Sequence, residues 1–570
     1  MSNSRLSRGV GVLVAGVVLT AGLVALRAQA PEFDLLIANG RIVDGTGAPW
    51  FSADVGIKGG RIVAIGRLGD RTAATRIDAP GLVVAPGFVD MLGQSEFNVL
   101  VDSRAASKVT MGVTTEVTGE GQSIAPVNDR MIADGKDTWD HYGLTQDFRT
   151  LGGYFERLAT RDKPAINMAS FVGAGTLRDY VIGKEERPAT PADLEKMRAL
   201  VAQAMEEGAL GLSTSLQYVP DRFNSTADLI EMARVAKRYG GIYITHQRSE
   251  SGAIDQSMDE VFRIAREAAI PAEIWHFKTA YRANWGRMPS VLARLEAARA
   301  DGLDVSANIY PYTRASNGLD ACLPLWVREG GTEKIIARLK DPASRERIRK
   351  EMDDPASPGW ENQWFGSGGG DGVMVSEVLN QSLKKYEGRT LTQIGKDENK
   401  DPRDALMDIV VADRGNTQCI ISIMREDDVR TALVHRLVSF GTDSGAKAED
   451  GPLAGTKGHP RGWGSFARIL GKYVRDEKLM SLEEAIRKMT SLPAHRVGLL
   501  DRGLLRPGMA ADITVFDPAT IHDVATFEDP NHYSVGVRTV VVNGQVVVAD
   551  GKITTARPGL PLRGPGYRRQ

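Results

Sequence analysis

Two patterns of hydrophobic and polar positions divide this chain. From Phe33 to Ala85, apolar and polar residues alternate in short runs interrupted by Asn-Gly or Gly-Gly, as in LLIANGRIVDG and DVGIKGGRIVAIG. Such interrupted alternation is a strong signal for β-hairpins. The same pattern returns near the C-terminus in ADITVFD (Ala511–Asp517) and VRTVVVNGQVVVADG (Val537–Gly551). Each end is too small to bury a core alone, so we expect residues 31–85 and 500–555 to form one composite β-sandwich.

The middle of the chain, residues 86–499, shows a different pattern. Short, nearly continuous apolar runs alternate with amphipathic stretches such as ADLEKMRALVAQAMEEG and TADLIEMARVAKRYGG. Runs of this kind are typical of parallel strands covered by helices on both faces. A segment at about 325–404 breaks the rhythm and predicts an insertion over the barrel mouth.

The number of apolar runs indicates the fold class. Counting the one that ends at Asp90, there are roughly eight to nine, as a (β/α)₈ barrel requires. The others are Val113–Gly119, Ile166–Gly173, Ala209–Ser215, Gly241–His246, Pro271–His276, Val305–Pro311, Cys419–Met424 and Leu437–Asp443. The sequence therefore predicts an α/β protein, a TIM-like (β/α)₈ barrel with a small β-sandwich domain built from both chain ends.

The N-terminus has the parts of a secretory signal peptide. Arg5 and Arg8 precede an apolar run from Gly9 to Leu26, and the small-x-small sequence Ala28-Gln29-Ala30 follows. This order favours cleavage after residue 30 and export to the periplasm or the medium. The alternative is an uncleaved anchor, because a membrane span needs roughly 17–25 apolar residues.

Composition narrows the classes of partner. The formal net charge is −1 over 570 residues, and no block of like charge stands out. This balance argues against a nucleic-acid partner. Cys322 and Cys419 lie far apart, without metal or redox spacing, and are expected to be ordinary buried thiols. After signal cleavage we expect no membrane partner, and the sequence does not indicate an oligomeric state.

Polar residues that end the apolar runs are the candidates for chemistry, because the reactive groups of such a barrel lie at the carboxyl ends of its strands. They are Asp90, Glu120, His246, His276, Lys278, Tyr310 and Asp443. Two histidines and several carboxylates have the ligand types of a zinc-like divalent ion. A lone buried histidine is usually structural, but two at successive strand ends favour a metal site.

The chain resembles the amidohydrolase superfamily, and within it the N-acyl-D-amino-acid deacylase (D-aminoacylase) family. The resemblance runs from about Phe33 to Gly551. The motifs that carry it are NGRIVDGTG, APGFVD, MGVTTEVTG, GLSTSLQYVP, GIYITHQRSE, IWHFKTAYRANWGR, NIYPYT, GTDS, HPRGWGSFARILGKYVR, IRKMTSLPAHRVGL and RGLLRPGMAADITVFDP.

The resemblance implies a role for each matching residue. His246 and His276 match two metal ligands, and Asp443 matches the aspartate that carries a proton beside the metal. Positions that resemble the family's substrate-binding residues are Lys278, Tyr310 and Arg461 for a carboxylate, and Tyr218 for the substrate side chain. The substrate would then be a small molecule with a carboxylate group, and the D configuration is implied by the resemblance alone.

The sequence departs from the family at the other ligands. Leu92 and Gln94 stand where a His-x-His pair is expected, and Gly121 stands where a cysteine is expected. A glutamate oxygen binds zinc-class ions at about 2.0–2.2 Å, so we hypothesise that Glu120 replaces the cysteine. Glu96 is a second candidate for that place.

The sequence thus predicts an exported, metal-dependent N-acyl-(D-)amino-acid deacylase that uses one divalent metal ion, Zn²⁺. Two alternatives stay open. One is a hydrolase of another amide, such as a dipeptide or a lactam. The other is a catalytically inactive barrel that binds a ligand, since the loss of two histidines and a cysteine is also what decay would produce.

Overall fold

Strands from the two ends of the chain meet in one sheet. The computed structural model describes residues 31–356, 359–455 and 457–568, so the predicted signal peptide (1–30) lies outside the described residues. The sheet has nine strands in the order β21-β20-β19-β18-β5-β1-β2-β3, with β4 paired to β1. Its strands are β1 (Phe33–Ile42), β2 (Phe51–Lys58), β3 (Arg61–Gly66), β4 (Ala73–Asp78), β5 (Val83–Pro86), β18 (Ile513–Phe516), β19 (Val537–Val542), β20 (Gln545–Ala549) and β21 (Lys552–Ile553). The two halves join where β5 pairs antiparallel with β18.

Eight parallel strand positions form the barrel. They are occupied by β6 (Phe88–Asp90), β7 (Val113–Thr118), β8 (Asn167–Ser170) continued by β9 (Val172–Gly173), β10 (Gly211–Ser215), β11 (Ile242–His246), β12 (Ala272–Ile274), β13 (Val305–Ile309) and β17 (Val438–Phe440). Backbone hydrogen bonds close the ring between its first and last strands: Met91 N–H donates to Phe440 O at 3.2 Å, and Asp443 N–H donates to Leu92 O at 2.7 Å. The predicted (β/α)₈ fold is confirmed.

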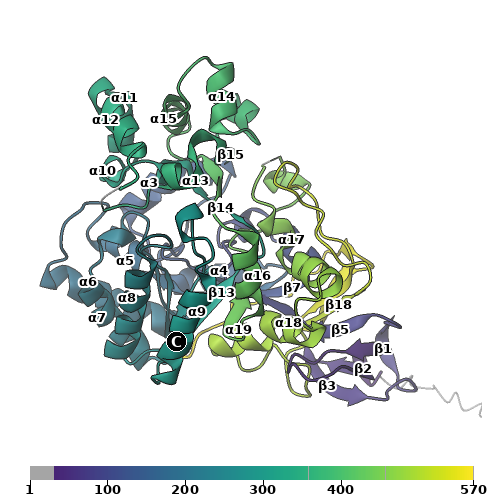
Figure 1. The fold of residues 1–570 in the computed structure, drawn as a ribbon. Coiled ribbons are helices and arrows are strands. Elements are labelled where there is room, and N and C mark those ends of the chain that lie inside the picture. Colours follow the sequence, from purple (N-terminus) through teal and green to yellow (C-terminus); the bar gives the residue numbers. More distant parts are fainter. Residues whose placement is uncertain (1–30, 357–358, 456, 569–570) are drawn as a thin grey trace, which may run out of the picture.

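Helices cover the outside of the barrel, as Figure 1 shows for α6 to α9. The sequence sets their ends: Thr190 and Asp193 form a capping box at the start of α6, and Ser225 and Asp228 form one at the start of α7, which satisfies backbone N–H groups that a helix leaves unpaired. The helices around the barrel include α2 (Ala106–Thr110), α4 (Leu151–Thr160), α5 (Ala174–Val181), α6 (Pro191–Glu207), α7 (Thr226–Arg238), α8 (Ile254–Glu267), α9 (Met288–Ala300), α16 (Glu426–Val434), α17 (Arg461–Arg468), α18 (Leu482–Met489) and α19 (Ser491–Arg496). Among the described residues, no helix is long and apolar enough to cross a membrane.

The insertion between β13 and β17 stands above the barrel in Figure 1. It contains β14 (Arg314–Gly318), β15 (Val373–Glu377), β16 (Gln418–Ser422), α10 (Leu325–Arg328), α11 (Thr332–Lys340), α12 (Pro342–Met352), α13 (Gln363–Ser367), α14 (Leu391–Asp397) and α15 (Pro402–Ala412). We expected Cys419–Met424 to be a barrel strand, and this is wrong. The run forms β16, which pairs antiparallel with both β14 and β15, and an apolar run at the centre of a small sheet looks the same in sequence as a buried barrel strand.

A buried lysine holds the first and last barrel strands together. Lys108 Nζ on α2 lies 2.7 Å from Asp90 Oδ2, 2.7 Å from Thr442 Oγ1 and 2.7 Å from Ser444 O. Glu116 Oε2 on β7 is 3.3 Å from the same ammonium group. All three charged side chains are fully buried, so the ammonium compensates carboxylates that would otherwise be costly to desolvate.

Replacing Lys108 by Met should therefore destabilise the protein strongly. The two carboxylates would stay buried without their cation, and breaking a buried pair in this way costs about 3–5 kcal/mol. The measurement is the free energy of unfolding from urea denaturation. Lys136→Met is the matched control, because Lys136 pairs with Asp140 on the surface, where a pair contributes about 0–1 kcal/mol. Equal losses for the two variants would contradict this assignment.

Candidate active site

A cavity of about 670 Å³ opens at the carboxyl ends of the barrel strands. The eight predicted site residues lie at or beside it: Glu120, Tyr218, His246, His276, Lys278, Asp443 and Arg461 line its wall, and Tyr310 packs beneath Arg461. Their positions follow from the fold, because each comes at or shortly after the end of a barrel strand or, for Arg461, at the start of α17. The parallel strands thus bring together residues that are far apart in sequence.

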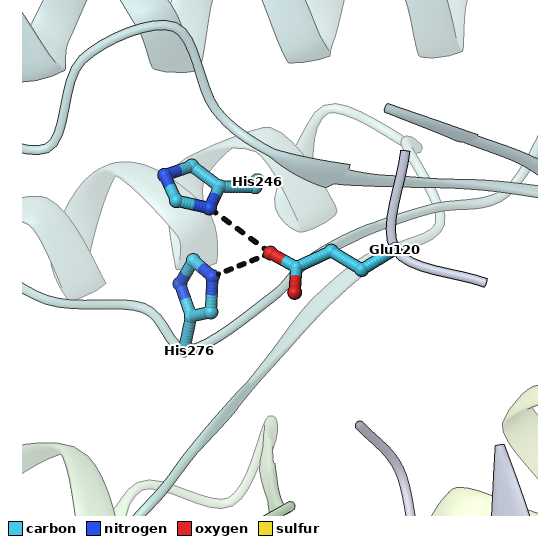
Figure 2. Close-up of side chains that lie close together, drawn as sticks. All are labelled: Glu120, His246 and His276. Atoms are coloured by element: carbon cyan, nitrogen blue, oxygen red, sulfur yellow. Dashed lines mark hydrogen bonds and ion pairs between the residues drawn. The ribbon is translucent and has the colours of Figure 1, made fainter. Parts of the chain in front are cut away.

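Glu120, His246 and His276 converge on one point. Glu120 Oε1 lies 3.0 Å from His246 Nδ1 and 3.0 Å from His276 Nε2. Figure 2 shows this carboxylate oxygen aimed between the two imidazole rings. The ligand atoms of the three residues all lie within 4.8 Å of one another. The structure therefore places Glu120 where the sequence hypothesis requires it.

The backbone at Gly121 explains why a glutamate rather than a cysteine faces the histidines. Gly121 has a φ of +62°, which disfavours a side chain. A Cβ atom at this position would lie 2.3 Å from Ser215 Cβ and 2.5 Å from Ser215 N. No cysteine fits there. The side chain of the preceding residue, Glu120, lies in the cavity.

The three residues fit a divalent metal ion of the zinc type. Two ligand atoms bound about 2.0–2.1 Å from a tetrahedral ion lie roughly 3.3 Å apart, close to the 3.0 Å that separates Glu120 Oε1 from each histidine nitrogen. One carboxylate oxygen and two imidazole nitrogens are also the donor set of catalytic zinc sites, which leave a fourth position open.

Glu250, which we did not single out from the sequence, lies behind the two histidines. Its Oε1 is 2.9 Å from His276 Nδ1, and its Oε2 is 3.8 Å from His246 Nε2, a buried atom without a hydrogen-bond partner. Lys278 Nζ lies 2.7 Å from the same His276 Nδ1, so Glu250 and Lys278 together surround the side of that ring that faces away from Glu120. Groups that contact the second nitrogen of a histidine orient the ring for metal binding through the other nitrogen. The only sequence signal was an acidic residue four positions after His246, inside the motif ITHQRSE.

The charges of the site shift its pKa values in different directions. Burial alone would raise the pKa of Glu120, but hydrogen bonds from His246 and His276 outweigh it and hold that pKa well below its usual range. Burial lowers the pKa of His246. For His276, burial and the Lys278 ammonium act in the same lowering direction, yet the nearby carboxylates, Glu250 first, prevail and raise its pKa to about 9.

Asp443 lies beside the three-residue cluster and is not part of it. Its Oδ2 pairs with Arg461 NH1 at 2.6 Å, and its Oδ1 accepts a hydrogen bond from Gln94 Nε2 at 3.0 Å. Burial raises the pKa of Asp443, with the Arg461 charge opposing the shift. Asp443 thus lies near the candidate metal ligands without joining them, a position from which a carboxylate can exchange a proton with a bound substrate.

The residues expected to bind a substrate carboxylate surround Tyr310. The Arg461 guanidinium stacks over the Tyr310 ring at 4.6 Å, and Lys278 Nζ lies 5.7 Å from the same ring centroid. Lys278 Nζ is also 2.7 Å from Glu250 Oε1. The buried Tyr310 hydroxyl has no hydrogen-bond partner among the described residues. Each cation thus already contacts a carboxylate of the protein: Lys278 contacts Glu250, and Arg461 contacts Asp443.

The remaining candidates, Tyr218, Leu92 and Glu96, lie outside the three-residue cluster. The Tyr218 ring packs edge-on against His246 at 5.0 Å, and its hydroxyl accepts a hydrogen bond from Asn317 Nδ2 at 3.1 Å. Leu92 is fully buried in an apolar cluster with Trp275 inside the barrel, so it serves packing. Glu96, the second candidate ligand, accepts a hydrogen bond from Gly119 N and does not join the three-residue cluster.

Comparisons with known proteins place the chain among the amidohydrolases. A profile described as the amidohydrolase family matches residues 411–548, and one described as the N-terminal domain of the urease alpha-subunit matches residues 12–88. The chain is similar to a D-aminoacylase of Alcaligenes xylosoxydans xylosoxydans, with 35% identity over 94% of this chain and 99% of that protein. On this similarity, the chain belongs to the D-aminoacylase family, and it is a hydrolase of carbon–nitrogen amide bonds.

Two solved structures of relatives resemble it in fold. One is an N-acyl-D-glutamate deacylase from Bordetella bronchiseptica in complex with zinc and a phosphonate mimic of the tetrahedral intermediate, with 32% identity, a TM-score of 0.76, and coverage of 93% of this chain and 100% of that one. The other is a D-aminoacylase described as having a binuclear metal centre with one-metal activation and second-metal attenuation, with 34% identity, a TM-score of 0.77 and the same coverage.

Metal binding should release a proton from His276. Because the pKa of this residue is about 9 in the metal-free protein, it is protonated at pH 7 and must lose its proton to become a ligand. Below pH 9 the affinity for Zn²⁺ should therefore fall about tenfold per pH unit for that one proton. Calorimetric titration of metal-free protein in buffers of different ionisation enthalpy measures the release. An affinity independent of pH between 6 and 8 would contradict this assignment.

Proposed function

We propose that this protein hydrolyses N-acyl-D-amino acids, releasing an amino acid and a carboxylate, with one divalent metal ion, Zn²⁺, held by Glu120, His246 and His276. The observation that carries the proposal is the meeting of Glu120 Oε1 with both histidines at 3.0 Å, in the cavity that also contains Asp443 and Arg461. The relatives named as deacylases of N-acyl-D-amino acids support the substrate class.

In the proposed hydrolysis, the metal ion activates water and Asp443 transfers the proton. A zinc ion held by Glu120, His246 and His276 would lower the pKa of a bound water to about 7 and polarise the substrate carbonyl. Asp443 takes a proton from the attacking water as its oxygen bonds to the carbonyl carbon. When the carbon–nitrogen bond breaks, Asp443 gives that proton to the leaving nitrogen and is restored. The products are an amine and a carboxylic acid, and the acid passes its remaining proton to the amine or to solvent, which leaves the carboxylate.

Arg461 links substrate binding to this proton transfer. Its guanidinium is buried and paired with Asp443 at 2.6 Å. A substrate carboxylate offers Arg461 a better, bidentate partner. Transfer of Arg461 to the substrate then frees Asp443 Oδ2 to act as a base. Tyr310 supports the guanidinium from below, and its unpartnered buried hydroxyl is available to the same carboxylate.

A single metal ion suits the rest of the site. Leu92 is an apolar core residue, and the Gln94 amide donates hydrogen bonds to Glu120 and Asp443. Neither residue supplies a ligand for a second ion. The one-metal activation described for a related D-aminoacylase supports this proposal.

Tyr218 and the N-terminal segment carry two further parts of the proposal. A D-aminoacylase and an N-acyl-D-glutamate deacylase are similar to this chain at 35% and 32% identity. Tyr218, beside Asn317, remains our candidate for contact with that side chain. The pattern Arg5, Arg8, Gly9–Leu26 supports export to the periplasm or the medium.

Removing the metal ligands should remove both metal and activity. Glu120→Ala, His246→Ala and His276→Ala should each lose stoichiometric zinc and hydrolysis of a panel of N-acetyl-D- and L-amino acids, dipeptides and lactams, because two ligands hold the ion much more weakly than three. Metal content and released amino acid are measured on purified protein. His532→Ala is the control, because His532 pairs with Asp529 on the surface. Zinc retained at one per chain in all three variants would refute the site.

Arg461→Lys tests the recognition of the carboxylate. The variant keeps the charge and loses the planar fork that binds a carboxylate through two hydrogen bonds. The preference of kcat/KM for an N-acetyl-D-amino acid over its carboxamide analogue should fall about 10-fold or more. Comparison of two substrates on one enzyme cancels any effect of the lost pair with Asp443. An unchanged preference would show that the carboxylate binds elsewhere.

A further inference from the structure

Gln94 connects the two carboxylates on which the proposed reaction depends. Its Nε2 donates to Glu120 Oε2 at 2.9 Å and to Asp443 Oδ1 at 3.0 Å. An amide –NH₂ has two hydrogens, and here each has its own carboxylate acceptor. The reversed amide would place its carbonyl oxygen against both carboxylates, so the hydrogen bonds fix the orientation of the group.

We propose that Gln94 is a positioning residue of the hydrolytic site, which holds the carboxylates of Glu120 and Asp443 in register with each other. This inference rests on the proposed function. At the position where the family resemblance implies a histidine ligand, this chain carries a hydrogen-bond donor. The donor acts on the carboxylates and not on the metal.

Asp443 needs such a donor once a substrate is bound. In this structure its two oxygens are held separately, Oδ2 by Arg461 and Oδ1 by Gln94. When Arg461 moves to the substrate carboxylate, the Gln94 amide is the side-chain hydrogen bond that keeps Asp443 oriented. The same amide lies between two negative groups, whose repulsion would otherwise turn Asp443 away from Glu120.

The loop that carries Gln94 is held firmly from below. Gln94 N–H donates to Ser444 O at 3.2 Å. Glu116 accepts hydrogen bonds from both the backbone N–H and the hydroxyl of Ser95 at 2.8 Å. A Cβ at Gly93 would lie 2.0 Å from Glu116 Oε1, so only glycine fits over that carboxylate. The backbone therefore presents the Gln94 side chain to the cavity in a set direction.

The exposure of Gln94 makes the inference testable. The residue lines the cavity and is exposed, and it belongs to none of the hydrophobic clusters. Its substitution removes two hydrogen bonds from the site without leaving a void in the core. A change in activity can then be separated from a change in folding.

The experiment compares Gln94→Met, Gln94→Glu and the wild-type protein. Gln94→Met has nearly the same shape and no donor, so kcat for an N-acetyl-D-amino acid should fall about 10–100-fold, the usual effect of losing a supporting hydrogen bond at a metal site. KM should change less than about threefold, because the substitution removes no contact between the protein and the substrate. The dissociation constant of Zn²⁺, measured by chelator competition, should rise about tenfold as Glu120 loses its anchor. Gln94→Glu adds a third carboxylate and should lower kcat further.

Gln203→Met is the matched control. It removes the same amide from a hydrogen bond with a carboxylate, that of Glu207, on the surface of α6, and should leave kcat, KM and zinc affinity unchanged. A Gln94→Met enzyme with wild-type kcat and zinc affinity would overturn the inference. So would a rise in KM alone, which would make Gln94 a substrate contact. If the wild-type protein releases no amino acid, the proposed function fails, and the zinc-affinity comparison still decides the role of Gln94.

Discussion

One carboxylate oxygen organises the functional end of this protein. Glu120 Oε1 faces His246 and His276 at the same distance, and each of the three residues comes from a different strand end. The two imidazole rings pack edge to face at 4.3 Å, and the oxygen is the group that engages a nitrogen of each. The donor Gln94, the carboxylate Glu250 and the aspartate Asp443 are all arranged around the point where it lies.

The local backbone allows this arrangement. A left-handed glycine at 121 packs closely on β10, and the side chain of the preceding residue, Glu120, lies in the cavity. On the opposite side, Gly93 rests directly on Glu116, which in turn depends on Lys108 for its charge balance. The backbone of two loops thus fixes the surroundings of the cluster formed by Glu120, His246 and His276.

The sequence predicted the barrel because about eight nearly continuous apolar runs alternate with amphipathic helical stretches. It also led to the hypothesis that Glu120 takes the place of the expected cysteine, because a carboxylate is a common zinc ligand and Glu120 is next to that position. It did not reveal Glu250 or the role of Gln94, because both act through contacts between segments distant in the chain. The run Cys419–Met424 was misassigned because a central strand in any small buried sheet has the same apolar pattern.

The insertion gives the cavity a wall that the barrel does not encode. Arg461, on the barrel side, donates a hydrogen bond to Ser316 O of β14, and Tyr218 meets Asn317 of the same strand. Two residues that we propose to bind the substrate, Arg461 and Tyr218, are therefore braced by a separate, three-stranded element, although they themselves lie on the barrel. Changes in that element can redirect the enzyme to new compounds while its bond-breaking chemistry stays intact.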